Sequence, residues 1–179
     1  MAGEYAFVGS GTNNWATNKY SAIVAGVSNR AGGLGSFIGA GASNYTANIC
    51  SFIGAGGRNI VKYEYAAIVA GLLNSNSAPY GGIVAGYANV ISDQGFSFIG
   101  GGYSNEIRDV TGGADGSKYA FIGGGKDNKV YGRYSAIHGG YYNAAYGMYS
   151  AIPGGVYNIA SGMCSYAAGC YANAGHNGA

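Results

Sequence analysis

Charge, proline and export signals are all scarce in this chain of 179 residues. Charged side chains make up 9% of it, whereas they make up about a quarter of an ordinary soluble domain. The net charge is only +2 and the basic residues are scattered, so we expect no nucleic-acid partner. Two prolines are too few for collagen, and an apolar fraction of 48% is too high for a disordered glycine-rich linker.

The first eleven residues lack the basic start and apolar core of a signal peptide, so an exported form needs a signal outside this sequence. Release by cell lysis is the alternative to export through a signal peptide. No apolar run approaches the ~18 residues of a membrane span, and we expect none. Three cysteines do not form a disulfide framework. Cys164 and Cys170 would lie about 20 Å apart on one strand, beyond the reach of a disulfide, so we predict free, packed thiols.

A strict repeat takes the place of these features. The unit is clearest from Tyr134 to Met148, and we number it so that Tyr134 is position one and Asn143 is position ten. Glycine fills position seven in all but one unit, and isoleucine dominates position four. The aligned asparagines are Asn14, Asn29, Asn44, Asn59, Asn74, Asn89, Asn105, Asn128, Asn143, Asn158 and Asn173.

Fifteen residues suit two short strands joined by two tight turns. Glycine at positions seven and fourteen suits turns that need a positive φ. The asparagine is expected to tolerate left-handed backbone and to stack its amide on the next coil. We therefore predict an all-β parallel β-solenoid, a single domain over residues 1–179 with eleven coils of about 15 residues. At about 4.8 Å per coil, the rod would be about 50 Å long.

Positions three and five point to one side of the first strand, and their sizes compensate. Phe52 is followed by Gly54, for example, whereas Ala67 is followed by Val69. Voids and overpacking each cost about 1–3 kcal/mol, so this pattern predicts a close-packed outer face covered by a second copy of the chain. The alternative is an exposed aromatic face. The predicted packing and assembly residues are Phe7, Phe37, Phe52, Phe98, Phe121, Ile23, Ile38, Ile53, Ile68, Ile137 and Ile152.

The unit Tyr-Ser-Ala-Ile-x-Gly-Gly-x-x-Asn-x-Ala-x-Gly resembles the parallel β-roll repeats of trimeric autotransporter adhesin heads. It is at least as similar to the Ser-x-Ile-Gly-Gly-Gly-x-x-Asn repeats of bacteriophage and large-virus fibre proteins. The resemblance covers residues 5–173 and implies a left-handed coil and a homotrimer whose three rolls pack along an axis. Asparagine here stands where the autotransporter heads often have alanine.

No catalytic, cofactor-binding or metal-binding set can be assembled from the repeat. The glycine-rich turns lack the Gly-Lys-Ser/Thr of a phosphate loop, and His138 and His176 lie in unrelated contexts. We therefore expect no enzyme, no cofactor and no metal. The insertion at residues 108–118 carries Asp109 and Asp115, whose spacing matches neither an EF-hand nor a calcium-binding glycine-rich repeat. We expect a solvated loop, and it is the best single candidate for specific recognition.

Tyrosines at positions eight and nine predict a ladder along one edge of the rod. Such a ladder would pack against a neighbouring rod or stack on sugar rings. The candidate recognition residues are Tyr87, Tyr103, Tyr141, Tyr142, Tyr157 and Tyr171.

These features predict a non-enzymatic structural fibre, filament or surface-display protein, located extracellularly, at a cell surface or on a virion. Neither end of the sequence carries a helical or charged cap, so we expect a segment of a longer fibre or a head-to-tail filament. The alternative is an adhesin or receptor-binding head that recognises a cell-surface glycan or protein. Ice binding is disfavoured, because the sequence has no Thr-x-Thr ladder.

Overall fold

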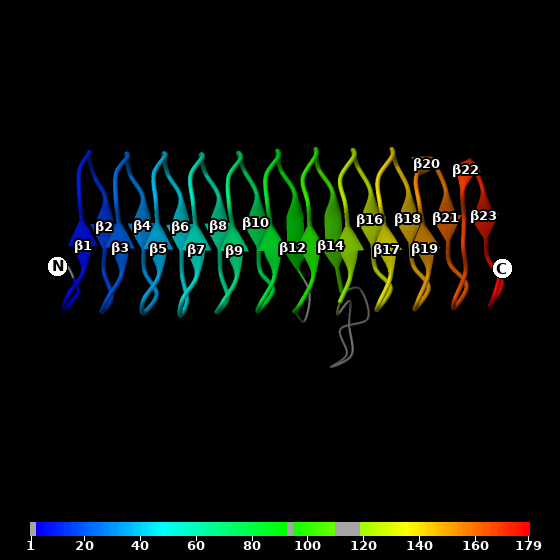
Figure 1. Ribbon diagram of the computed structural model, residues 1–179, viewed down its shortest axis with the longest axis horizontal. Coiled ribbons are helices and arrows are strands. Elements are labelled where there is room, and N and C mark those ends of the chain that lie inside the picture. Colours follow the sequence, from blue (N-terminus) through cyan, green and yellow to red (C-terminus); the bar gives the residue numbers. More distant parts are fainter. Residues whose placement is uncertain (1–2, 93–94, 110–118) are drawn as a thin grey trace.

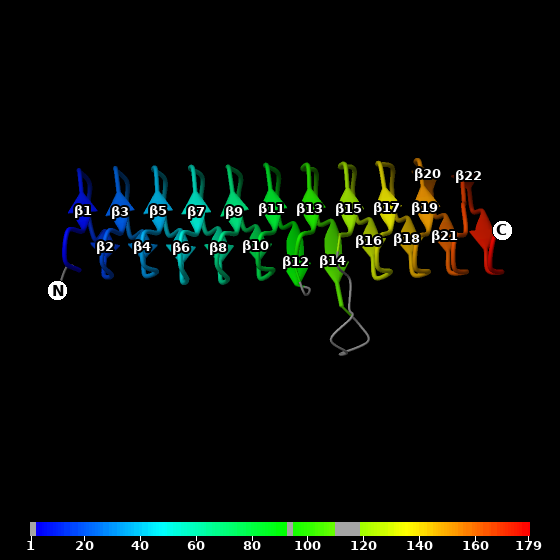
Figure 2. The ribbon, with the colours of Figure 1, turned by 60° about the horizontal axis from the view of Figure 1, so that its bottom comes forward.

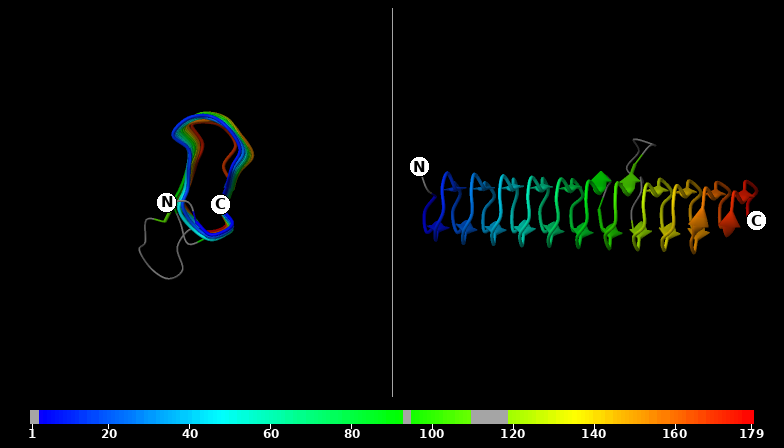
Figure 3. Two further views of the ribbon diagram at one scale, coloured as in Figure 1. Left: turned by 90° about the vertical axis from the view of Figure 1, so that its left-hand side faces the viewer. Right: turned by 90° about the horizontal axis from the view of Figure 1, so that it is seen from above.

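The computed structural model describes residues 3–92, 95–109 and 119–179, and every regular element in these residues is a β-strand. The coils lie side by side along one axis from the N-terminal to the C-terminal end (Figure 1). Viewed end-on, successive coils nearly superimpose (Figure 3). The chain is therefore a parallel β-solenoid, as predicted.

Each coil except the last contributes one short strand to each of two sheets, and the last contributes a strand to the second sheet alone; the sheets form two rows along the rod (Figure 2). The first sheet has ten strands, in the order β1 (Phe7–Val8), β3 (Ala22–Ile23), β5 (Phe37–Ile38), β7 (Phe52–Ile53), β9 (Ala67–Ile68), β11 (Gly82–Ile83), β13 (Phe98–Ile99), β15 (Phe121–Ile122), β17 (Ala136–Ile137) and β19 (Ala151–Ile152). The second has eleven, in the order β2 (Trp15–Ala16), β4 (Arg30–Ala31), β6 (Tyr45–Thr46), β8 (Ile60–Val61), β10 (Ser75–Asn76), β12 (Val90–Ser92), β14 (Glu106–Arg108), β16 (Lys129–Val130), β18 (Ala144–Ala145), β21 (Ile159–Ala160) and β23 (Asn173–Ala174). A further pair joins β20 (Gly155–Val156) and β22 (Gly169–Cys170).

The register follows the repeat. Position three pairs with position three of the next coil, as Phe37 with Phe52, and position eleven pairs with position eleven, as Arg30 with Tyr45. The isoleucines of position four point inward and are buried, and the residues of position twelve complete the same core. Ile68 and Val61, for example, are fully buried. Position four is thus the inner position of the first sheet, and positions three and five are its outer positions.

The recurrent asparagines form a buried hydrogen-bonded ladder inside the turn. Asn59 donates its backbone N–H to Oδ1 of Asn44 over 3.0 Å, and its own Oδ1 accepts the N–H of Asn74 over 3.1 Å. Its Nδ2 donates to the carbonyls of Ala55, at 3.3 Å, and Gly71, at 2.8 Å. The ladder therefore provides hydrogen-bond partners for backbone carbonyl and N–H groups of the turn that the strand pairing does not satisfy. The predicted stacking of the amide is confirmed.

The left-handed residues are not all where the sequence predicted them. Glycine at position seven has positive φ, as expected, but the asparagine of position ten does not; the residue before it does, such as Arg58 at φ 52°. The glycines of position fourteen, such as Gly33, do not have positive φ either. A Cβ on Gly33 would lie 1.9 Å from the carbonyl oxygen of Asn48, so glycine there permits close approach of two coils. The third left-handed site is position one, occupied mainly by tyrosine, such as Tyr65 at φ 54°.

The last coil is one residue shorter than the sequence alignment implied. Gly155 pairs with Gly169, and Ala172 donates its N–H to Oδ1 of Asn158 over 3.0 Å. Ala172 therefore occupies position ten, and Asn173 lies one position beyond the ladder. Glycine fills position seven here too, because Gly169, not Cys170, is the left-handed residue. The missing residue falls after position four, so Ala167 at position four and Ala174 at position twelve both remain buried in the core.

One core hydroxyl lacks a partner. Thr46 occupies position twelve between Ala31 and Val61, is fully buried, and its Oγ1 makes no hydrogen bond to any described residue. Replacing Thr46 with valine is expected to raise the free energy of unfolding by about 1 kcal/mol, because the unpaired hydroxyl is removed at nearly equal volume. Urea denaturation followed by circular dichroism measures this, and Val61→Thr is the reverse control. A lower free energy of unfolding for Thr46→Val would contradict the conclusion that the Thr46 hydroxyl has no hydrogen-bond partner.

Candidate functional site

The outer face of the first sheet is apolar along the whole rod. We call the side chains at positions three and five the apolar face. None of them is charged, and only His138 and Tyr166 carry a polar side-chain atom. Yet Val69 is 49% exposed and Phe7 54% exposed in the single chain. The charged side chains of the sheets lie on the outer face of the second sheet instead, at Arg30, Glu106 and Lys129 among others.

The size compensation on this face has a cause within one chain. A Cβ added to Gly54 would lie 3.4 Å from Cε1 of Phe52, and one on Gly9 would lie 3.2 Å from the ring of Phe7. Each of these rings therefore lies over the glycine two residues further on in its own coil. A larger residue at either glycine would crowd the ring of its own coil, and its Cβ would also lie 2.4 Å from the carbonyl oxygen of Val24 or Val69 in the next coil. The compensation alone does not require a partner, whereas the exposure of the uncharged face favours one.

The residues predicted for packing and assembly divide between the two sides of the first sheet. The isoleucines of that set are fully buried within the coil and cannot contribute to an interface. The phenylalanines point outward. Phe37 stacks on Phe52 with ring centroids 5.5 Å apart, Phe98 stacks on Phe121 at 6.0 Å, and the ring of His138 meets Phe121 edge-on at 5.8 Å.

The predicted tyrosine residues form two rows at the turn after the first sheet. At position eight, Tyr87 stacks on Tyr103 at 5.1 Å, and Lys126 continues the row. Its Nζ lies 5.2 Å from the ring centroid of Tyr103 and 5.4 Å from that of Tyr141, so the cation is held between two rings. The described ladder at position eight is therefore mixed rather than wholly aromatic.

At position nine, Tyr142, Tyr157 and Tyr171 stack at 5.1 and 5.2 Å. Tyr171 belongs to this row, not to position eight, because the last coil is a residue short. Desolvation among these rings raises the pKa of the Tyr141 hydroxyl, with further contributions from Tyr142 and Tyr157. Desolvation also raises the pKa of Tyr131, next to Glu106 and Tyr146. The hydroxyls of Tyr141 and Tyr131 therefore stay protonated, and able to donate, to higher pH than in water.

Stacking determines what these rows present to a partner. Within a row, each ring covers the face of the next, so ring edges and hydroxyls point to the surroundings. Sugar rings stack on aromatic faces, and such faces are free only at the ends of a row. A glycan or protein partner at these rows would therefore be bound through the hydroxyls.

A longer aromatic row runs along position one, which the sequence analysis did not assign a role. Its centroids are 4.8 to 5.2 Å apart. Its members are Tyr65, Tyr80, Phe96, Tyr119, Tyr134 and Tyr149. Left-handed backbone costs about 1–2 kcal/mol for such residues, and stacking returns about 0.5–1.5 kcal/mol per pair. The recurrence of tyrosine at position one was the sequence signal for this row.

Of the two acidic candidates, Asp109 lies in the described part of the chain. Asp109 directly follows β14 and donates its N–H to the carbonyl of Ser92 over 3.1 Å, whereas Asp115 lies outside the described residues. No group of three His, Cys, Asp or Glu suited to a metal occurs in the described part of the chain. The prediction of packed cysteines was wrong. Cys50, Cys164 and Cys170 are free but exposed: Cys50 and Cys164 lie in turns, and Cys170 ends the short strand β22.

Over residues 3–92, 95–109 and 119–179, no helix has the length and apolarity of a membrane span. Comparison with protein-family models finds none that matches the sequence, and comparison with curated proteins finds no match either. The interpretation of this chain therefore depends on its own repeat, faces and edges.

Proposed function

We propose that the chain is a non-enzymatic structural module of a fibre, filament or surface-display assembly, in which three copies pack through the apolar face. The observation that carries this proposal is an uncharged, exposed face that continues along the rod. Burying such a face is favourable by about 25 cal/mol per Å². A face without charges or many hydrogen-bonding groups suits a partner that is equally apolar, and a second copy of the chain provides one. The number three and the left-handed coil come from the resemblance to fibre and adhesin repeats.

The second sheet supports an arrangement with one face inward. Its outer positions mix charged, polar and aromatic side chains, including Arg30, Glu106 and Lys129. Such a surface is typical of one that stays in water. Packing the first sheets together would leave these side chains outside. The assembly would act at a cell surface, on a virion or elsewhere outside the cell.

Analytical ultracentrifugation of the purified chain tests the assembly. We expect a mass of three times the 18.0 kDa chain mass. A sedimenting species of a single chain at micromolar concentration would overturn the proposal. Negative-stain electron microscopy of the same sample then distinguishes discrete rods from a head-to-tail filament.

A second function, recognition of a glycan or surface receptor, is favoured by the two tyrosine rows at positions eight and nine. These rows belong to the turn that follows the first sheet, whereas the apolar face is carried by the strands of that sheet. In this function the rod would be a rigid support for a row of hydrogen-bonding groups.

A further inference from the structure

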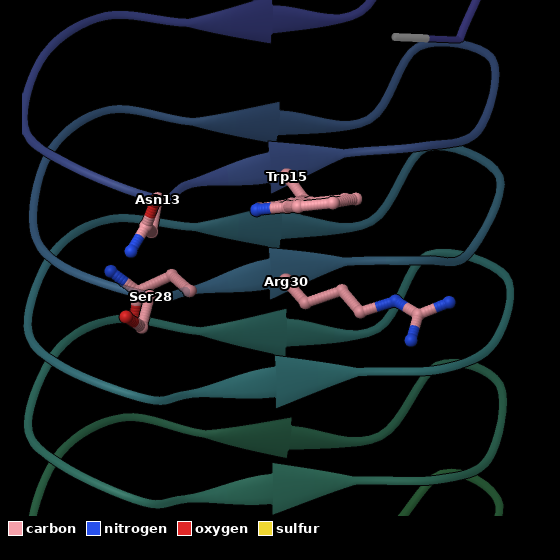
Figure 4. A pocket seen from close by; sticks show the side chains of 5 residues that line it. Asn13, Trp15, Ser28 and Arg30 are labelled. Carbon is pink, nitrogen blue, oxygen red and sulfur yellow. The ribbon is translucent and has the colours of Figure 1, made fainter. Parts of the chain in front are cut away.

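A hollow of about 440 Å³ lies on the outer side of the first two coils of the second sheet. It is lined by Asn13, Trp15, Ser28, Asn29 and Arg30. Figure 4 shows Trp15 and Arg30 on successive strands, with Asn13 and Ser28 at the preceding bend. Asn29 belongs to the buried ladder, so four side chains remain available to a ligand.

Trp15 provides a free aromatic face. It is the one tryptophan of the chain, and it is 59% exposed on β2. Unlike the stacked tyrosines, its indole has no ring stacked on it among the described residues. An exposed indole beside polar groups suits a ligand that has both an apolar surface and hydroxyls, as a sugar ring does.

Arg30 provides a charge with no acidic partner. It pairs in register with Trp15 on the next strand, and its guanidinium carbon lies 5.5 Å from the ring centroid of Tyr45, which helps to hold it in place. The other charged side chains before Arg58 are Glu4 and Lys19, which pair with each other at 3.1 Å. Arg30 is therefore the uncompensated side-chain charge of the first three coils. A planar guanidinium in this state favours a carboxylate, which it can bind through two parallel hydrogen bonds.

Asn13 and Ser28 provide uncharged hydrogen-bonding groups. Both occupy position nine, with φ of 56° and 57°, and both are exposed. Neither side chain hydrogen-bonds to another described residue. An amide and a hydroxyl both donate and accept, which matches the mixed character of sugar hydroxyls.

We infer that this hollow binds an acidic saccharide. A sugar ring lies on the indole of Trp15, its carboxylate pairs with Arg30, and its hydroxyls bond to Asn13 and Ser28. A single cation and a single ring are too few for nucleic acid, which requires repeated phosphate contacts. The site does not depend on the proposed trimer, because it lies on the second sheet, and the apolar face lies on the first.

Titration of tryptophan fluorescence tests the inference directly, because Trp15 is the only reporter. The probe is trigalacturonate, and the control is the corresponding neutral galactose trisaccharide. We expect a saturable change in emission with the acidic probe, and affinity at least about tenfold lower for the neutral one. Arg30→Gln should abolish this preference. Lys129→Gln, at the same strand position near the other end of the rod, should leave it unchanged.

Trp15→Ala, measured by calorimetry, should lose binding of both saccharides. Circular dichroism confirms that each variant keeps the fold. An absence of saturation at millimolar trigalacturonate would overturn the inference, and so would an affinity of the Arg30→Gln variant for trigalacturonate equal to that of the wild type. Equal loss in Lys129→Gln would show diffuse charge attraction instead. Tighter binding of a single-stranded oligonucleotide would reassign the hollow to nucleic acid.

Discussion

Replacing Asn59 with alanine is expected to lower the free energy of unfolding by about 3 kcal/mol or more. The change removes the Nδ2 donor to the carbonyls of Ala55 and Gly71, and it removes the Oδ1 that accepts the N–H of Asn74. Asn59 is fully buried, so water cannot replace these bonds without opening the coil. The neighbouring amides of the ladder would lose their partners as well. Urea denaturation followed by circular dichroism gives the change.

The chain offers a matched control for this variant. Asn173 aligns with the ladder in sequence, but it occupies position eleven of the last coil and is exposed. Asn173→Ala should therefore change the stability by less than about 0.5 kcal/mol. Equal losses from the two variants would show that the last coil keeps the alignment of the sequence, contrary to the structure.

Replacing Val69 with glutamate should convert the proposed trimer into single chains. Val69 lies at the centre of the apolar face and is 49% exposed in one chain, so the carboxylate remains solvated in a monomer. In the trimer it would be buried against an apolar partner, at a cost of several kcal/mol per charge. Because each copy carries the change, the cost is multiplied across the assembly. Sedimentation should show the mass of one chain with the circular dichroism spectrum preserved.

Ser75→Glu is the control for assembly, since it adds the same charge in the same coil on the outer face of the second sheet. It should leave the sedimentation of the wild type unchanged. Loss of assembly in Ser75→Glu, with assembly kept in Val69→Glu, would place the interface on the second sheet. The proposal would then be wrong about the face.

Much of the fold follows from periodicity alone. The recurrence of isoleucine at position four and of glycine at position seven predicted stacked coils, the inner position of each strand and one class of left-handed residue. These predictions succeeded because every coil meets its neighbour through the same positions, so local sequence and long-range contact repeat together. The tyrosines of positions eight and nine were placed on a turn for the same reason, with Tyr171 shifted by the short last coil.

Predictions failed where a residue type can be favoured at a position for two different physical reasons, and the sequence does not show which one applies. Asparagine at position ten was assigned to left-handed backbone, but its buried amide holds the ladder, and the residue before it takes the positive φ. Glycine at position fourteen was assigned to the same conformation, but it serves close approach of the coils. Packed cysteines were expected because no disulfide could join them, whereas Cys50 and Cys164 lie in turns and all three are exposed.

The sequence by itself determined the coil length, the buried isoleucines, the β-solenoid and the scarcity of charge, because each depends on a pattern repeated every 15 residues or so. Only the tertiary structure decided the register of the last coil and the burial of aromatic ring faces within rows. These features depend on which residues of different coils lie 5 Å apart, about one strand spacing. A single residue lost in a turn changes those neighbours without changing the composition of the repeat.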